Sequence, residues 1–217
     1  MLSRFDLVVF DWDGTLMDST VAISHSIQAA AVDLGLPVPP IERVRHVIGL
    51  GLSDALAHVV PDLEPSRAVE FAARYRHHYQ THEDRLGLYA GAQDLLKAIG
   101  QAGVTLAVAT GKSRLGLARA LKTTGLEGYF AGTRCADQTH PKPHPAMLLE
   151  LMQELGSTPE RTLMVGDTTH DLGMAQAAAT AAVALTHGAH TAEQLRAFAP
   201  LTLVHSLPEL QQWLMHR

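Results

Sequence analysis

The sequence contains a single cysteine, Cys135, among its 217 residues. One cysteine excludes an intrachain disulfide framework and is typical of a protein kept in a reducing compartment. Lys and Arg residues form no cluster, and the net charge is −5, from 17 basic and 22 acidic residues. Nucleic-acid-binding surfaces are strongly basic, so this balance argues against DNA or RNA as a partner.

Long apolar runs are missing as well. No segment approaches the roughly 20 consecutive apolar residues that a membrane-spanning helix requires. The apolar run before Asp11 is too short for the apolar part of a secretory signal, and Asp11 and Asp13 interrupt it. We therefore expect a soluble, cytoplasmic protein that binds no membrane. The sequence leaves a monomer and a homodimer equally open.

The composition is otherwise that of an ordinary folded protein, with 47% apolar and 18% charged residues. The sequence shows no internal repeat and no low-complexity tract. Its length is sufficient for one large domain, or for a core with a small second lobe.

Short aliphatic runs alternate with helical patterns along most of the chain. The runs have the length and continuous apolar character of strands buried on both faces, and they lie at residues 7–10, 104–109, 162–165, 182–185 and 201–204. Helical patterns lie at residues 92–102, 113–124, 145–155, 171–179, 192–198 and 207–215. This alternation predicts an α/β protein with a Rossmann-like parallel sheet and helices on both faces.

The segment between the first strand and Tyr89 breaks the alternation. It contains no strand of comparable quality, and its helix-like stretches lie at about residues 19–34, 41–48, 52–59 and 65–82. Turn-forming Gly and Pro residues separate these stretches. We expect a helical cap domain at residues 17–85, inserted after the first strand of a core domain formed by residues 1–16 and 86–217.

Polar side chains gather where the predicted strands end. In a parallel α/β sheet, ligands bind beyond the carboxyl ends of the strands, so these residues are candidates for a common site. The candidates follow a strand or lie in the proline-rich loop at residues 140–145, and they are Asp11, Asp13, Thr110, Gly111, Lys112, Lys142, Asp167 and Asp171. They would bring carboxylates, a hydroxyl and lysines to one edge of the sheet.

Clustered carboxylates suit a hard divalent cation. Mg²⁺ prefers oxygen ligands and keeps coordination positions for water and phosphate. Lys142 adds positive charge, and Thr110 offers a hydroxyl at an expected helix N-terminus, where backbone N–H groups favour anions. We therefore expect Mg²⁺ and a small phosphorylated substrate, with one neutralised carboxylate free to attack phosphorus.

Four motifs occur in a fixed order along the chain. They are Asp-x-Asp-Gly-Thr-Leu from Asp11, Thr110 after the second strand, Lys-Pro-x-Pro from Lys142, and a Gly-Asp-x-x-x-Asp that contains Asp167 and Asp171. This order resembles the haloacid dehalogenase superfamily of phosphatases, over residues 6–171. The helical insertion resembles the cap of the branch that includes phosphoglycolate phosphatase and β-phosphoglucomutase.

The resemblance implies a chemical role for several of the matched residues. Asp11 would be the nucleophile and form an aspartyl-phosphate. Asp13 would protonate the leaving oxygen and then activate water. Thr110, together with Gly111, would bind the phosphoryl oxygens, and Lys142 would neutralise Asp11 and the phosphoryl group.

The resemblance also implies a magnesium site. Its ligands would be Asp11, the backbone carbonyl of Asp13, and Asp167. Asp171 lies four residues after Asp167 and would act as a ligand, through water, or as an orienter of Lys142.

The sequence is compatible with more than one function. A Mg²⁺-dependent phosphatase on a small metabolite, with phosphoglycolate as the first candidate, is favoured by the resemblance, and a phosphosugar mutase or phosphosugar phosphatase is the alternative. A dehalogenase needs neither Mg²⁺ nor a carboxylate at the position of Asp13, so that class is disfavoured. The full set of chemical residues also disfavours a non-catalytic phosphate-binding protein.

Other polar residues have simpler interpretations. Lys112 opposes the dipole of the following helix, and we expect it to be solvated or to support the site indirectly. His78 and His82 lack a further ligand at metal spacing, which favours a solvated cap helix. Cys135 is expected to be a small buried hydrophobe. The loop Gly49-Leu50-Gly51 is either a substrate-specificity loop or a break between two helices.

Overall fold

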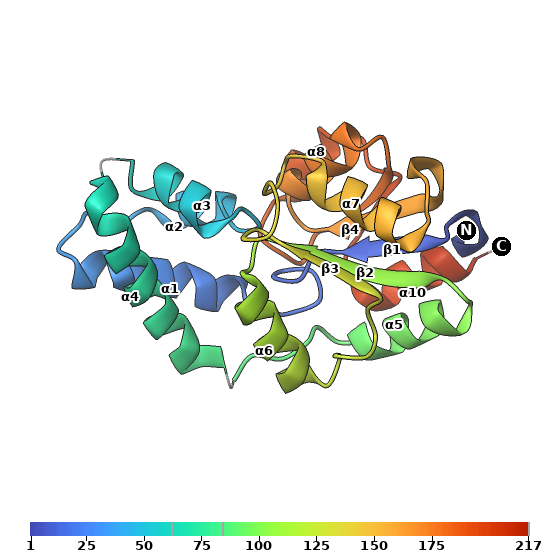
Figure 1. Ribbon diagram of the computed structural model, residues 1–217, viewed down its shortest axis with the longest axis horizontal. Helices are drawn as coiled ribbons and strands as arrows, with labels where there is room; N and C mark the ends of the chain where they lie inside the picture. The colour runs from blue at the N-terminus through green and yellow to red at the C-terminus, as the bar shows by residue number, and fades with distance from the viewer. Residues whose placement is uncertain (62, 84, 217) are drawn as a thin grey trace.

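The computed structural model describes residues 1–61, 63–83 and 85–216. Its centre is a six-stranded parallel sheet in the order β3-β2-β1-β4-β5-β6 (Figure 1). The strands are β1 (Leu7–Phe10), β2 (Thr105–Thr110), β3 (Gly132–Cys135), β4 (Thr162–Gly166), β5 (Ala181–Leu185) and β6 (Thr202–Val204). The predicted α/β fold with a Rossmann-like parallel sheet is confirmed.

Helices cover both faces of this sheet. One face carries α5 (Ala92–Gln101), α6 (Arg114–Thr124) and α10 (Leu207–Met215), and the other carries α7 (Ala146–Leu155), α8 (Thr169–Ala177) and α9 (Ala192–Arg196). The alternation of side chains along β1 joins the two layers: Val8 and Phe10 pack under α5 and α10, whereas Leu7 and Val9 pack under α7 and α8. Burial on both faces explains why β1 is apolar throughout.

Four consecutive helices separate β1 from α5. They are α1 (Thr20–Asp33), α2 (Ile41–His46), α3 (Leu52–Val59) and α4 (Pro65–Glu83). Their apolar side chains form most of one hydrophobic cluster, which includes Ile27, Val44, Leu56 and Phe71 and, from outside these helices, Ala189. Figure 1 shows these helices together at the end of the sheet opposite the two chain termini. That end is the one at which the parallel strands finish.

The short strand β3 is the main difference from the elements that the sequence predicts. Its sequence, Gly-Thr-Arg-Cys, is not an apolar run. An edge strand that is paired on one side only, with two partly exposed central residues, does not require one. Cys135 ends this strand and is fully buried, as expected. Helix α8 begins at Thr169, earlier than its apolar pattern indicated, because Thr168 and Asp171 form a capping box. Within the described residues, no helix has both the length and the apolar character needed to cross a membrane.

Candidate active site

The order of the strands brings three of the candidate residues to one point. β1 pairs with β2 on one side and with β4 on the other, in a register that aligns Phe10 with Val108 and Val165. Asp11 follows β1, Asp167 follows β4, and Thr110 is the last residue of β2. All three side chains are buried. Their positions follow from the sheet topology, since parallel strands that are neighbours end at the same edge.

Lys142 supplies a buried positive charge to this edge. It lies in the loop between β3 and α7, and its Nζ is 2.7 Å from Asp11 Oδ1 and 2.6 Å from Asp171 Oδ1. Burial alone would lower the pKa of Lys142, but the charges of Asp11 and Asp171 outweigh it and raise the pKa. Lys142 therefore remains an ammonium ion that bridges two carboxylates.

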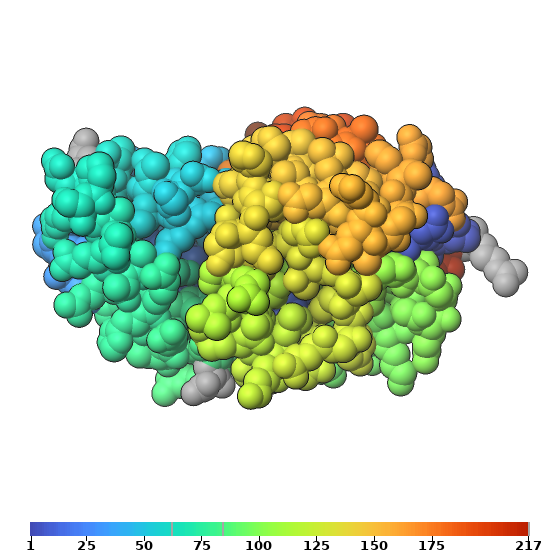
Figure 2. All heavy atoms as spheres, in the orientation of Figure 1, coloured from blue at the N-terminus to red at the C-terminus, as the bar shows by residue number. Residues whose placement is uncertain are grey.

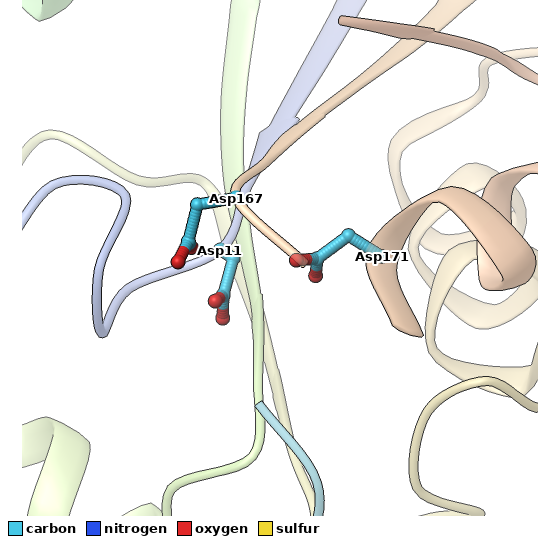
Figure 3. Close-up of side chains that lie close together, drawn as sticks. All are labelled: Asp11, Asp167 and Asp171. Carbon is cyan, nitrogen blue, oxygen red and sulfur yellow. The ribbon is translucent and has the colours of Figure 1, made fainter. Parts of the chain in front are cut away.

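Three buried carboxylates form a cluster at this edge, and two of them contact Lys142. Asp11, Asp167 and Asp171 each offer an oxygen, and these oxygens lie within 4.8 Å of one another. Figure 3 shows the carboxylate of Asp171 directed from the start of α8 toward the other two. Such a group can hold a metal ion. The positive charge of Lys142 alone does not balance three carboxylates.

The electrostatics of the cluster fit a cation. Burial raises the pKa of Asp11 well above its usual range, and Lys142 opposes this effect only in part. Burial, together with the charge of Asp171, raises the pKa of Asp167 to about 7. Asp11 Oδ1 is paired with Lys142, whereas Asp11 Oδ2 is buried and accepts no hydrogen bond from any residue that the structure describes. A buried, unpartnered carboxylate oxygen is costly unless a ligand or an ion completes it.

Asp167 is held rigidly on both of its oxygens. Thr15 Oγ1 donates to Oδ1 at 2.7 Å, and the backbone N–H of Ala189 donates to Oδ2 at 2.7 Å. Two glycines make room for this carboxylate: a Cβ on Gly14 would lie 2.3 Å from Oδ2, and a Cβ on Gly188 would lie 2.0 Å from it. Gly14 also has a φ of +84°, which side chains rarely adopt. The Gly-Thr pair after Asp13 therefore orients Asp167.

Asp171 contacts Lys142 directly. Its other oxygen, Oδ2, accepts hydrogen bonds from the backbone N–H and the hydroxyl of Thr168, at 3.0 Å and 2.7 Å. The capping box at the start of α8 thus fixes the carboxylate that holds Lys142. Of the roles left open for Asp171, the orienting of Lys142 corresponds to a contact in the structure.

Asp13 has partners different from those of the other three carboxylates. Its Oδ1 accepts from Ser19 Oγ at 2.7 Å and from Lys112 Nζ at 3.1 Å, and Lys112 Nζ also donates to Tyr79 Oη at 3.0 Å. Of the two interpretations of Lys112, the structure fits indirect support of the site and not solvation, because its side chain is only 9% exposed and contacts Asp13. Burial lowers the pKa of Lys112, but the charge of Asp13 outweighs that effect and raises it.

Sequence reasoning did not identify Ser19 or Tyr79 as partners of this site. Ser19 precedes α1, and its hydroxyl is an ordinary helix-start signal that gave no indication of Asp13. Tyr79 lies in α4 and reaches Lys112 only because the fold places this helix across the cavity from the core. No local signal in the sequence could have found that contact.

Thr110 and Gly111 are the remaining candidate residues at this edge of the sheet. Thr110 Oγ1 accepts from the backbone N–H of Lys112 at 3.2 Å, which leaves the hydroxyl hydrogen to donate elsewhere. A Cβ on Gly111 would lie 2.4 Å from the carbonyl oxygen of Leu50 and 2.6 Å from that of Gly49. The loop Gly49-Leu50-Gly51 therefore lies directly on the core, and only glycine at position 111 permits this approach.

A cavity of about 680 Å³ lies between α1–α4 and the core. Asp11, Asp13, Thr110, Gly111 and Lys112 contribute to its lining. Figure 2 shows the surface of α4, in teal, against the yellow-green surface of α6 and the residues that follow it. These five candidate residues therefore face the space between the two groups of helices.

Among the residues that the structure describes, no histidine belongs to a cluster of three or more groups able to hold a metal ion. His78 contacts Asp33 at 2.8 Å on the outside of α4 and α1. This agrees with the interpretation of that segment as a partly solvated helix.

Comparison with known proteins assigns the family. The model of the haloacid dehalogenase-like hydrolases matches residues 8–185. The chain is 38% identical to the probable phosphatase IndB of Dickeya dadantii, over 94% of this chain and 91% of that protein. It is 33% identical to a phosphoglycolate phosphatase of Aliivibrio fischeri, over 90% of each chain. The chain belongs to the haloacid dehalogenase-like hydrolase family.

A solved structure agrees with this assignment at the level of the fold. A hydrolase from Pseudomonas syringae superposes with a TM-score of 0.88 at 20% identity, over 95% of this chain and 96% of that one. The resemblance inferred from the four motifs is confirmed, and so is the enzyme class that it implies, a haloacid dehalogenase-type phosphatase.

Proposed function

We propose that this protein is a Mg²⁺-dependent phosphomonoesterase that acts on a small phosphorylated metabolite through an aspartyl-phosphate on Asp11. The surroundings of Asp11 carry the proposal: a fully buried carboxylate, 2.7 Å from Lys142 Nζ, with a second oxygen that accepts no hydrogen bond from the described residues. A carboxylate in this setting is available for attack once cations neutralise it.

In the first step, a carboxylate oxygen of Asp11 attacks phosphorus and forms a new P–O bond. The bond between phosphorus and the alcohol oxygen breaks, its electron pair stays on that oxygen, and Asp13 supplies the proton. Lys142 and the hydroxyl of Thr110 stabilise the negative charge on the phosphoryl oxygens. The contacts of Asp13 with Ser19 and Lys112 support this role, because they fix one oxygen and leave the other for the substrate.

In the second step, Asp13 takes a proton from water, and the water oxygen attacks phosphorus. The bond between the Asp11 oxygen and phosphorus breaks, which restores the carboxylate and releases inorganic phosphate. The same residue thus acts first as an acid and then as a base. Lys142, held by Asp171, stays beside the Asp11 oxygen in both steps.

Asp11, Asp167 and the backbone carbonyl of Asp13 would hold the cation. When bound, Mg²⁺ neutralises the carboxylates and the phosphoryl oxygens. The buried cluster of Asp11, Asp167 and Asp171 supports this assignment. The raised pKa values of Asp11 and Asp167 also support it, because they mean that nearby positive charge does not fully compensate the burial of either carboxylate.

We further propose that residues 17–85 form a cap domain over a catalytic core of residues 1–16 and 86–217. The separate hydrophobic cluster of α1–α4 and the cavity between these helices and the core support this division. A cap that covers the site excludes water and competing acceptors from the phosphoenzyme. The single, buried Cys135 supports a cytoplasmic location.

The test is release of inorganic phosphate from a panel of phosphorylated metabolites, with phosphoglycolate as the first candidate because a relative carries that activity in its name. Wild type with Mg²⁺ should release phosphate, EDTA should stop the reaction, and Asp11→Asn should abolish it while the protein stays folded. Turnover by Asp11→Asn would refute the nucleophile. A requirement for a bisphosphate activator would instead indicate a mutase.

A further inference from the structure

The cavity is much larger than a two-carbon substrate requires. Its volume is about 680 Å³. Phosphoglycolate has nine non-hydrogen atoms and fills at most about 270 Å³, at the ~30 Å³ that each water molecule occupies in the liquid. The phosphoryl group would lie at the end formed by Asp11 and Thr110. More than half of the space therefore remains for the organic part of a substrate.

The cap side of this space is apolar and aromatic. Ile23 and Ile27 of α1, Ile48 after α2, and Tyr75 of α4 contribute to its wall. The rings of Tyr75 and Tyr79 are 6.0 Å apart and tilted by 30°. Walls of this kind bind apolar, ring-containing groups, since both the buried area and the aromatic contacts favour them.

Two of the three cations in the described lining are paired with carboxylates. Lys112 is paired with Asp13 at 3.1 Å, and Arg119 Nε is paired with Glu83 Oε2 at 3.3 Å. Glu83 Oε1 is buried and accepts no hydrogen bond within the described chain. Arg76, the other cation of the described lining, is exposed to solvent. A carboxylate on the substrate would thus lie near the unpartnered oxygen of Glu83, and it would compete with Asp13 and Glu83 for Lys112 and Arg119.

We infer that the preferred substrate is the phosphate monoester of a neutral alcohol that carries an apolar ring. This inference rests on the proposed function and narrows it. The ring occupies the wall formed by the cap isoleucines and Tyr75, and Glu83 discriminates against an anionic group. Phosphoglycolate, which is small and carries a carboxylate, fits neither property of the cavity.

Four phosphate esters with alcohols of similar acidity test the inference: ethyl phosphate, phosphoglycolate, benzyl phosphate and 4-carboxybenzyl phosphate. We expect kcat/KM for benzyl phosphate to exceed that for ethyl phosphate and phosphoglycolate at least about tenfold, because ring burial contributes to binding of the transition state. We expect the carboxybenzyl ester to fall below the benzyl ester by a similar factor. Phosphoglycolate as the best of the four would overturn the inference and leave the proposed function intact. Hydrolysis of none would overturn both.

Two variants locate the effect in the cavity. Tyr75→Ala should reduce the preference for benzyl over ethyl phosphate to about threefold or less, whereas Tyr129→Ala, an exposed tyrosine outside the cavity lining, should keep the wild-type ratio. Glu83→Gln retains the size of the side chain and should raise kcat/KM for 4-carboxybenzyl phosphate relative to benzyl phosphate. Because each readout is a ratio within one variant, a partial loss of folded protein does not alter it. Unchanged ratios in both variants would overturn the assignment.

Discussion

Lys142→Met removes the buried cation of the site and leaves its carboxylates behind. Both the side chain of Lys142 and that of Asp171 are fully buried, and the Asp11 carboxylate is 1% exposed. Removing one partner of such a buried ion pair typically costs about 3–5 kcal/mol, because the remaining charges lose their compensation. For a chain of this size, that cost lowers the midpoint of thermal unfolding by on the order of 10 °C.

The loss of folding stability in Lys142→Met should depend on pH. Burial already raises the pKa of Asp11, and Lys142 is the group that opposes this shift most strongly. Without Lys142, the pKa of Asp11 in the folded protein rises further. Above that pKa Asp11 is charged in the folded state, so the full destabilisation is present. It shrinks as the pH falls through the pKa and the carboxyl group takes up a proton. The gap between variant and wild type should therefore be largest at high pH.

The assay is thermal unfolding in EDTA at several pH values between 5 and 9, followed by circular dichroism. Lys122→Met is the matched control, since Lys122 is exposed in the last turn of α6 and should cost less than about 0.5 kcal/mol. Added Mg²⁺ should narrow the gap for Lys142→Met by supplying positive charge to the same carboxylates. Equal midpoints for the two variants across the pH range would refute the electrostatic account of the site.

Three further predictions concern the carboxylates and their surroundings. Asp13→Asn should lower kcat/KM for ethyl phosphate by about 10²–10⁴-fold, and much less for p-nitrophenyl phosphate, whose leaving group needs no proton; equal losses on the two esters would contradict the acid role. Gly188→Ala should weaken Mg²⁺ binding at least about tenfold in calorimetry, because its Cβ would lie 2.0 Å from Asp167 Oδ2. Gly100→Ala, whose Cβ meets nothing within 4 Å, is its control. Burial raises the pKa of Asp167 to about 7, so Mg²⁺ must displace a proton below that pH. Mg²⁺ affinity should then fall up to about tenfold per pH unit from 7 toward 5, while the metal-free protein becomes more stable over the same interval. Affinity that is constant from pH 5 to 8 would show that the carboxylate is not protonated in this way.

The sequence by itself determined the layered fold and the residues that reach its functional edge. Strands buried on both faces require continuous apolar runs, so β1, β2 and β4 were visible as local patterns, and Asp11, Thr110 and Asp167 could be placed at their ends. The glycines and threonines of the turns were visible for the same local reason. β3 was missed because a half-paired edge strand has no need of such a run.

Only the tertiary structure decided which side chains meet. Lys112 is 99 residues from Asp13 and 33 from Tyr79, and it contacts both because the fold places α4 opposite the core. The helix dipole left two interpretations open, a solvated lysine or one that supports the site indirectly, and the contacts of Lys112 with Asp13 and Tyr79 correspond to the second. The size and charge of the cavity likewise arise from two groups of helices brought together, and no pattern within one segment encodes them.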